Sequence, residues 1–302
     1  MEYMKVSQAA KMWGISARRV RVLCAEGKIE GVVRSGKLYL IPANAKKPAD
    51  GRMSKGTVTD RLAAIERKRG LLATRRPLTA GEVERLAEEF LIDFTYNSNA
   101  IEGNTLTLKE TAIALEGMTV DQKPLKDHLE AVGHRDAFLY VQDVAKNNLP
   151  LSEYVIKCIH ALVLMNRPED RGQYRRIPVR VAGAYTEPVP PYLIEEKMAR
   201  LLAVNEGRVD IMTTVERVAL FHLEFEGIHP FIDGNGRTGR LILNLELIRN
   251  GYPPINVKFT DRRRYYDAFD AFYRDGDPGA MIDLVAEYVE GRLDEYLQIL
   301  GE

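Results

Sequence analysis

The chain contains little cysteine, no long apolar run and no excess of charge of either sign. Among its 302 residues only Cys24 and Cys158 carry a thiol, and their spacing fits neither a metal site nor a disulfide framework. No apolar run reaches the length of a membrane span, and the first residues lack the apolar centre of a signal peptide. We therefore expect a cytoplasmic protein that does not contact the membrane.

The zero net charge conceals an uneven distribution along the chain. Residues 1–50 hold ten Lys/Arg against four Asp/Glu, whereas the remainder holds 33 against 39. A small basic module joined to a larger acidic one is typical of a protein that contacts nucleic acid at one end. A solvated basic face explains the same numbers equally well.

The first 48 residues have the pattern of a winged helix-turn-helix. Two short helices, each opened by a serine that can cap it, precede two apolar runs that flank Ser35-Gly36 and predict a hairpin. The segment resembles the excisionase-like winged helices of some bacterial proteins, and this resemblance implies DNA binding; docking onto a protein is the alternative. The side chains expected to face DNA are Arg18, Arg19, Arg21 and Lys37.

The rest of the chain is expected to be mainly α-helical. A polar stretch containing Pro and Gly ends near residue 52, so 49–84 are expected to form a linker and a connecting helix, and 85–302 a second domain. Residues 174–191 are the exception, because they are rich in Val, Pro and Gly, and 179–189 are expected to form a small β-hairpin. The hydrophobic spacing predicts helices at 57–75, from 79 to about 94, and at 107–117, 125–146, 151–164, 192–205, 211–226, 238–249, 261–274 and 278–298.

A glycine-rich segment between two of these helices has the features of an anion site. Gly234, Gly236 and Gly239 allow consecutive backbone N–H groups to converge on an anion, and the following helix adds the positive end of its dipole. Arg237 and Arg240 lie one turn apart and can reach the same phosphates. The segment therefore predicts a phosphate site.

The same segment carries the groups needed for attack on a phosphate ester. Asp233 is a hard oxygen ligand suited to Mg2+ held against phosphates, and Asn235 is placed to donate a hydrogen bond to a phosphate oxygen. His229, whose ordinary pKa is near neutrality, can take a proton from an incoming hydroxyl.

Other interpretations of this region fit less well. Gly234–Gly239 matches the dinucleotide-binding fingerprint literally, but a helix rather than a strand precedes it. A Walker loop requires Gly-Lys-Ser/Thr, which is absent from the sequence. A metal cluster of His222, Glu224, Glu226 and His229 lacks the spacing of two His on one helix, and His222 is expected to be a core histidine.

Residues 229–240 resemble the signature of the Fic family, His-Pro-Phe-x-Asp/Glu-Gly-Asn-Gly-Arg-x-x-Arg, and match it at every fixed position. Most members of this helical family transfer AMP from ATP to Ser, Thr or Tyr of a protein. The resemblance implies that His229 is the general base, that Asp233 holds Mg2+ and that Phe231 anchors the loop in the core. The residues it implies for ATP binding are Gly234, Asn235, Gly236, Arg237, Gly239 and Arg240 for phosphate, and Tyr265 and Tyr266 for adenine.

The expected hairpin also resembles a feature of the family, the flap that pairs with the backbone of the target. Val181, Ala182 and Gly183 would make this pairing, which tolerates many target sequences. The resemblance thus implies a protein substrate with a hydroxyl side chain, including the protein itself. It also implies a homodimer. An ordinary surface hairpin is the alternative interpretation.

The segment Ser98–Asn104 matches the inhibitory motif Ser/Thr-x-x-x-Glu-Gly/Asn that many Fic proteins carry. The resemblance implies that Glu102 pairs with Arg240 and denies the γ-phosphate its partner, while Ser98 or Asn104 holds the segment in register. The expected function is an autoinhibited AMP transferase. The alternatives are transfer of another nucleotide, removal of AMP, and a transcription regulator that only senses ATP.

Overall fold

The computed structural model describes residues 3–13, 20–21, 24, 29, 31–35, 38–43, 45, 58–77, 79–180, 185 and 187–301. The chain divides into two compact units, Met1–Gly56 and Thr57–Glu302, and each is described by itself.

The first unit contains a three-stranded antiparallel sheet and a short helix. The strands β1 (Tyr3–Lys5), β2 (Val33–Ser35) and β3 (Leu38–Pro42) lie in the order β1-β3-β2, and α1 (Val6–Trp13) follows β1. The hairpin expected around Ser35-Gly36 is present, because Ser35 pairs with Leu38, whereas β1 was not expected.

A small apolar core holds this unit together. Its buried residues are Met4, Ala9, Ala10, Trp13, Val20, Cys24, Ile29 and Ile41. Arg21 is exposed, as a DNA contact requires, whereas Arg18, Arg19 and Lys37 lie outside the described residues. DNA binding by this unit therefore stays a prediction.

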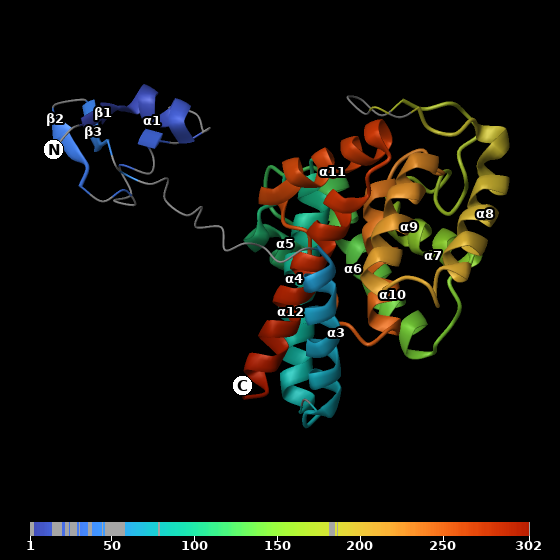
Figure 1. Cartoon of the computed structure of the whole chain (residues 1–302). Coiled ribbons are helices and arrows are strands. Elements are labelled where there is room, and N and C mark those ends of the chain that lie inside the picture. Colours follow the sequence, from blue (N-terminus) through green and yellow to red (C-terminus); the bar gives the residue numbers. More distant parts are fainter. Residues whose placement is uncertain are drawn as a thin grey trace. The chain divides into compact units, whose positions relative to one another are not determined.

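The second unit is helical, as expected, and most helix bounds differ from the predicted ones by one to three residues (Figure 1). Its helices are α3 (Val58–Thr74), α4 (Ala80–Ile101), α5 (Leu108–Leu115), α6 (Leu125–Lys146), α7 (Glu153–Val163), α8 (Ile194–Gly207), α9 (Thr214–Ile228), α10 (Asn235–Arg249), α11 (Arg262–Asp275) and α12 (Gly279–Ile299), with short 3-10 turns at Pro191–Leu193 and Phe259–Asp261.

Several helices begin at capping boxes written in the local sequence. Thr79, Thr107 and Thr213 each accept a hydrogen bond from the backbone N–H three residues on, and the Glu at that position bonds back to the cap. This arrangement satisfies two otherwise unpaired N–H groups and fixes where α4, α5 and α9 start.

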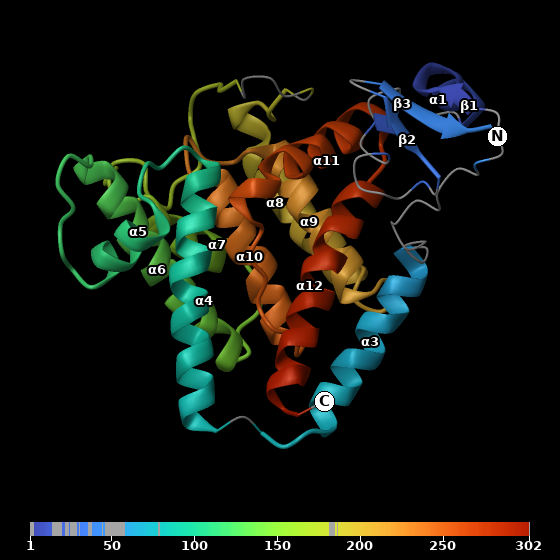
Figure 2. The same ribbon diagram turned by 90° about the vertical axis from the view of Figure 1, so that its left-hand side faces the viewer.

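Helix α10 lies at the centre of the second unit, against α9, α6, α7 and α4 (Figure 2). Leu241, Ile242 and Leu245 are buried in a core shared with α4, α6, α7, α8 and α9, whereas Leu243 and Leu247 face a second core shared with α9, α11 and α12. Because α10 is buried on both sides, its packing fixes the position of the turn that precedes it.

Helix α3 packs along α12 and belongs to the second unit rather than to a linker (Figure 2). Leu62 and Ile65 are buried in the core, and Arg61 forms an ion pair with Asp283 on α12. The expectation that 49–84 is only a connection missed this, because a charged amphipathic helix has the same sequence pattern whether or not its partner is distant in sequence.

Among the described residues, no helix is both long enough and apolar enough to cross a membrane.

Candidate active site

The predicted loop connects α9 and α10 over only six residues. Helix α9 continues through Gly227, which was expected to end it, and terminates with His229 in the left-handed conformation (φ 51°, ψ 59°). Helix α10 begins at Asn235, three residues before the predicted start, with Gly234 as its cap at φ 75°. Two left-handed residues therefore bracket the loop and turn the chain sharply onto α10.

Phe231 anchors the loop in the core, as expected. Its side chain is fully buried and stacks on the His160 ring, with centroids 3.6 Å apart and an interplanar angle of 5°. The Asn235 side chain closes the loop from the other side, because Oδ1 accepts from Phe231 N–H at 2.9 Å and Nδ2 donates to Phe231 C=O at 2.9 Å. Asn235 was expected to donate to phosphate, but its side-chain amide instead holds the loop.

His160 on α7 is a site residue that the sequence did not reveal. Its Nδ1 accepts from the Gly172 N–H at 2.9 Å, so Nε2 carries the proton and donates to the Asp233 C=O at 3.0 Å. Burial lowers the pKa of His160 to about 4, which keeps the ring neutral and this pattern fixed. His160 thereby orients the backbone beside the predicted metal ligand.

The His229 side chain is mostly buried beside Glu226, with 3.7 Å between His229 Nδ1 and Glu226 Oε2. Burial, and then the charge of Arg175, lower the pKa of His229 below its ordinary value. The imidazole is therefore neutral at physiological pH and able to accept a proton, as a general base must be.

Arg175 joins the loop between α9 and α10 to the base of the expected flap, a role that no sequence pattern indicated. Its guanidinium is buried and donates to the backbone carbonyls of His229 (2.8 Å), Ile177 (3.1 Å), Ile228 (3.4 Å) and Val189. One side chain therefore joins the end of α9 to both sides of the segment that contains the flap.

We expect Arg175→Met to lower the free energy of unfolding by about 2–5 kcal/mol, because several buried carbonyls lose their donor at once. Arg175→Lys should recover only part of this loss, since an ammonium cannot span the fork of acceptors. Urea unfolding of both variants measures the difference, and equal stability of Arg175→Met and the unmodified protein would contradict this role.

The flap itself lies largely outside the described residues. Val181, Ala182 and Gly183 are among the residues not described, and the described residues on either side, 177–180 and 187–190, are not strands. Pairing of this segment with a target stays a prediction.

Residues 98–104, which are expected to inhibit, meet the loop before α10 at Arg240, whose side chain is buried. Arg240 Nη2 donates to Glu102 Oε1 at 2.8 Å and to the Ser98 C=O at 2.8 Å, and Nε donates to Ser98 Oγ at 3.0 Å. Glu102 therefore faces Arg240 as expected, and Ser98, which was expected only to hold the segment in register, is a second partner of Arg240.

The Glu102 carboxylate also lies directly on the first turn of α10. A Cβ added at Gly236 would come within 2.2 Å of Glu102 Oε1, a distance that no real Cβ tolerates. Since this turn presents unpaired N–H groups and the positive end of the helix dipole, Glu102 lies where an anion is expected to bind.

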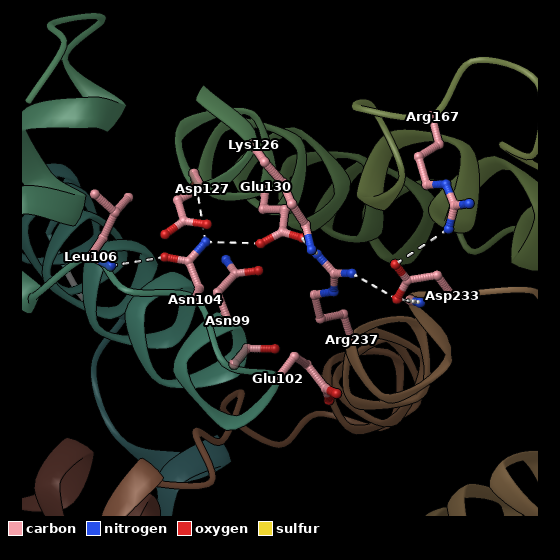
Figure 3. A network of polar contacts seen from close by, with 12 residues as sticks. Asn99, Glu102, Asn104, Leu106, Lys126, Asp127, Glu130, Arg167, Asp233 and Arg237 are labelled. Carbon is pink, nitrogen blue, oxygen red and sulfur yellow. Dashed lines mark hydrogen bonds and ion pairs between the residues drawn. The ribbon is translucent and has the colours of Figure 1, made fainter. Parts of the chain in front are cut away.

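Arg237 is held away from solvent rather than presented to a ligand. Its Nη1 lies 3.2 Å from Glu130 Oε1 on α6, and its Nη2 lies 3.4 Å from Asp233 Oδ1. Figure 3 shows that Glu130 also accepts from Asn104 Nδ2, at 2.9 Å. The Arg237 side chain, which is only 2% exposed, therefore contacts Asp233 and is connected through Glu130 to Asn104, at the end of the segment expected to inhibit.

Asp233 is the more accessible acid of this group, with 38% of its side chain exposed. Oδ1 accepts from the Gly234 N–H at 2.6 Å, and Oδ2 has Arg167 Nη1 at 3.9 Å, beyond hydrogen-bond reach (Figure 3). A cation bound at Oδ2 would therefore replace this long ion pair with Arg167.

The two tyrosines expected to contact adenine differ from each other. Tyr265 is buried, and its hydroxyl lies 2.5 Å from His222 Nε2 and accepts from Arg240 Nη1 at 3.3 Å, so it positions Arg240 instead. Tyr266 is 46% exposed and donates to the Ile101 C=O at 3.2 Å, which leaves its ring open to a ligand. His222 is a buried core residue, as expected.

Glu226 is a buried carboxyl that no predicted role explains. Its Oε1 has no hydrogen-bond partner in the described part of the chain, and a Cβ added at Gly239 would lie 2.9 Å from this oxygen. Burial, and then the charge of Glu102, raise the pKa of Glu226 to about 8, against the opposing effect of Arg240.

This raised pKa predicts how stability depends on pH. The folded protein keeps a proton on Glu226 that the unfolded chain loses near pH 4.5, so the stabilisation is complete below that pH and is lost as the pH rises through about 8. Glu226→Gln, which cannot ionise, should therefore gain stability over the unmodified protein by on the order of 3 kcal/mol between about pH 5 and about pH 7. Urea unfolding at both pH values tests this; a constant difference would contradict it.

Comparison with known proteins gives consistent results. Residues 150–247 match the Fic/DOC family. The chain is 34% identical over 247 residues to the protein adenylyltransferase Fic of Culex quinquefasciatus, an alignment that covers 80% of this chain and 48% of that protein. It is 33% identical over 219 residues to protein adenylyltransferase fic-1 of Caenorhabditis briggsae, covering 71% and 43%. The chain thus spans about half the length of the curated relatives it matches.

Solved structures share the fold. Fic-1 from C. elegans superimposes with a TM-score of 0.72 at 29% identity, covering 80% of this chain and 72% of that one. A Fic domain containing signaling protein from Bacteroides thetaiotaomicron gives a TM-score of 0.69 at 29% identity, covering 80% and 95%. Together with the loop geometry, these likenesses show that the chain contains a domain of the Fic/DOC family.

Proposed function

We propose that the chain is a protein adenylyltransferase that moves AMP from ATP to a Ser, Thr or Tyr hydroxyl of a protein. The observation that carries the proposal is the placement of a neutral, mostly buried His229 in the short loop that leads into the first turn of α10. The names of the related insect and nematode proteins support the same activity.

In this proposal the ATP phosphates lie on the first turn of α10. The backbone N–H of Gly236 faces them, whereas that of Gly234, also expected to do so, donates to Asp233 Oδ1 in the resting state. Arg240 pairs with the γ-phosphate once Glu102 has moved away. His229 takes the proton of the target hydroxyl, the hydroxyl oxygen bonds to the α-phosphorus, and the bond to pyrophosphate breaks. His160, Asn235 and Arg175 act through the backbone, because they fix the loop that carries these groups.

The site fits a magnesium ion bound jointly by protein and nucleotide. No cluster of three or more His, Cys, Asp or Glu that would hold a metal occurs in the part of the chain that the structure describes, so the ion would take most ligands from phosphate and water. Asp233 Oδ2, which forms a long ion pair with Arg167 in this structure, is the protein oxygen that would hold it. When bound, Mg2+ supplies charge neutralisation at the phosphates.

We infer that the resting protein is nearly inactive. Glu102 holds Arg240 and covers the first turn of α10, so neither the Arg240 guanidinium nor the backbone N–H groups of this turn are available to the γ-phosphate of ATP. ATP that binds in this state is not aligned for attack on the α-phosphorus.

Labelled ATP tests the proposed reaction. Full-length Glu102→Gly protein is incubated with Mg2+, a cell lysate and ATP labelled either on the α-phosphate or on the γ-phosphate. We expect protein-bound label, on lysate proteins and on the enzyme itself, from the α-labelled ATP alone. Label from γ-labelled ATP would indicate phosphoryl transfer, and no label from either would overturn the proposal.

The first unit is proposed to bind DNA through Arg21, together with Arg18, Arg19 and Lys37. The support is the basic charge of residues 1–50 and the exposure of Arg21. Gel-shift selection from a random DNA library with the full chain, and with all four residues changed to alanine, tests this. A homodimer is proposed by resemblance only, and sedimentation velocity tests it.

A further inference from the structure

The carboxyl groups of Glu102 and Glu226 lie against the same face of α10, one helical turn apart. A Cβ at Gly236 would collide with the Glu102 carboxylate, and a Cβ at Gly239 would lie 2.9 Å from Glu226 Oε1. Residues three apart are neighbours on a helix surface, so Gly236 makes room for Glu102, and Gly239 makes room for His222, whose Nδ1 would lie 2.6 Å from the added Cβ, and for Glu226. Arg240, in the next position, is the cation that both acids face.

Glu226 also faces the proposed general base. Its Oε2 lies 3.7 Å from His229 Nδ1, one turn further along α9, while Oε1 faces α10 without a hydrogen-bond partner among the described residues. A buried carboxyl oxygen without a partner is costly, which suggests a use that the resting state does not display. Its place between Arg240 and His229 indicates what that use is.

The surroundings of Glu226 contain few other charges. The titratable or charged groups that face it or His229 are His222 and His229 on α9, Arg240 on α10, Glu102 at the end of α4, Tyr265, Tyr266 and Tyr273 on α11, and Arg175 and Asp233 beside His229. His222 is neutral, because burial lowers its pKa to about 3. Glu102 and Glu226 therefore share Arg240 as their common counter-charge.

We propose that Glu226 is the positioning carboxylate of His229 and that Glu102 controls whether it carries its charge. With Glu102 on Arg240, burial and then the neighbouring charge of Glu102 keep the proton on Glu226. When Glu102 withdraws and before ATP binds, Arg240 loses its competing anion, which favours the ionised form of Glu226, whose carboxylate faces Nδ1 of His229. The inhibitory glutamate thus acts on the general base as well as on the phosphate site. This inference rests on the proposed function.

The proton balance is simple. The Glu226 proton goes to solvent when Glu102 leaves. During transfer the hydroxyl proton moves to His229 Nε2, the Nδ1 proton stays in place, and the imidazolium that forms lies beside a carboxylate that stabilises it. After pyrophosphate leaves, the imidazolium returns its proton to solvent.

Removal of Glu102 is expected to raise the pKa of His229, which is opposite in sign to the direct electrostatic effect of removing this carboxylate. Glu102 is itself negative and raises the pKa of His229, so its removal alone should lower that pKa. If the removal of Glu102 also ionises Glu226, whose Oε2 lies 3.7 Å from His229 Nδ1, this nearer negative charge should outweigh the loss of the Glu102 charge. The pKa of His229 should then rise.

Nuclear magnetic resonance of the His229 ring decides between these outcomes. Full-length protein with 13C-labelled histidine is titrated without nucleotide as four forms: unmodified, Glu102→Gly, Glu226→Gln and the double variant, with His229→Asn used to assign the signal. We expect Glu102→Gly to raise the His229 midpoint by about 1 pH unit or more where Glu226 is present, and to lower it in the Glu226→Gln background. A lowered or unchanged midpoint in both backgrounds would overturn the proposal.

Controls separate this outcome from folding and from the proposed reaction. Glu224→Gln, two residues away and paired with Arg208 on the other side, should leave the midpoint unchanged. Each form is checked by urea unfolding before titration. The titration needs no catalysis, so absence of label transfer from Glu102→Gly would refute the adenylyltransferase proposal while leaving the proton coupling measurable. Where transfer occurs, Glu226→Gln in the Glu102→Gly background should slow it at least about tenfold and alter its pH–rate profile.

Discussion

Glu102→Gly should raise the rate of AMP transfer by about 10- to 100-fold. The Glu102 carboxylate forms a charge-assisted hydrogen bond with Arg240 at 2.8 Å, and such a bond contributes about 1.5–3 kcal/mol. Its removal frees the arginine for the γ-phosphate and uncovers the first turn of α10, where Gly236 has no side chain of its own. The rate of label incorporation from α-labelled ATP at fixed protein concentration is the measurement.

Two companion variants locate the cause of this activation. Glu102→Gln keeps the length of the side chain but removes its charge, so it should activate less than Glu102→Gly because it still covers Gly236. Glu116→Gly removes an exposed carboxylate beyond the end of α5 and should leave the rate unchanged. Equal rates for the unmodified protein and Glu102→Gly would show that the pair does not inhibit.

Gly236→Ala should not activate, although it also displaces Glu102. Its Cβ would occupy the position now taken by Glu102 Oε1, which is also where the proposal places phosphate. Activation by this variant would show that the first turn of α10 is not the phosphate site, so it separates release of Arg240 from opening of the anion site.

The helices and the Glu102–Arg240 pair were predictable because their signals are local. The capping residue Thr79 specifies where α4 begins, and helical spacing alone predicts the bounds of α6, whereas α10 begins three residues before its predicted start. The pair joins residues 138 positions apart, yet each member belongs to a motif of fewer than thirteen residues. The pairing of Glu102 with Arg240 was therefore predictable from the resemblance to the Fic family and not from residue spacing alone.

The supporting residues were not predictable, because their roles depend on partners distant in sequence. His160 contacts Asp233 across 73 positions and Arg175 contacts His229 across 54, and neither belongs to a recognisable motif. The same limit explains Tyr265, since an aromatic pair at the start of a helix does not indicate which ring faces the core. Asn235 differs, because its motif was recognised, but its side-chain amide forms hydrogen bonds with the backbone of Phe231 in the loop.

His229→Asn in the Glu102→Gly background should lower AMP transfer by about 10²–10⁴-fold, the usual contribution of a general base. Asparagine is the better probe than alanine, because residue 229 adopts φ 51° and asparagine tolerates the left-handed region with little strain. ATP binding, measured by calorimetry, should stay within about threefold, since the imidazole receives a proton and does not hold the phosphates.

The pH dependence of the Glu102→Gly enzyme supplies the second half of this test. A general base acts in its neutral form, so the rate should fall on the acidic side as His229 gains a proton and should level off above that pH. The His229 midpoint measured by resonance and the acidic limb of the rate profile should coincide in the nucleotide-free enzyme, because kcat/KM reports the free form. If the limb persists in His229→Asn, another group accepts the proton, and the assignment of His229 as the base is wrong.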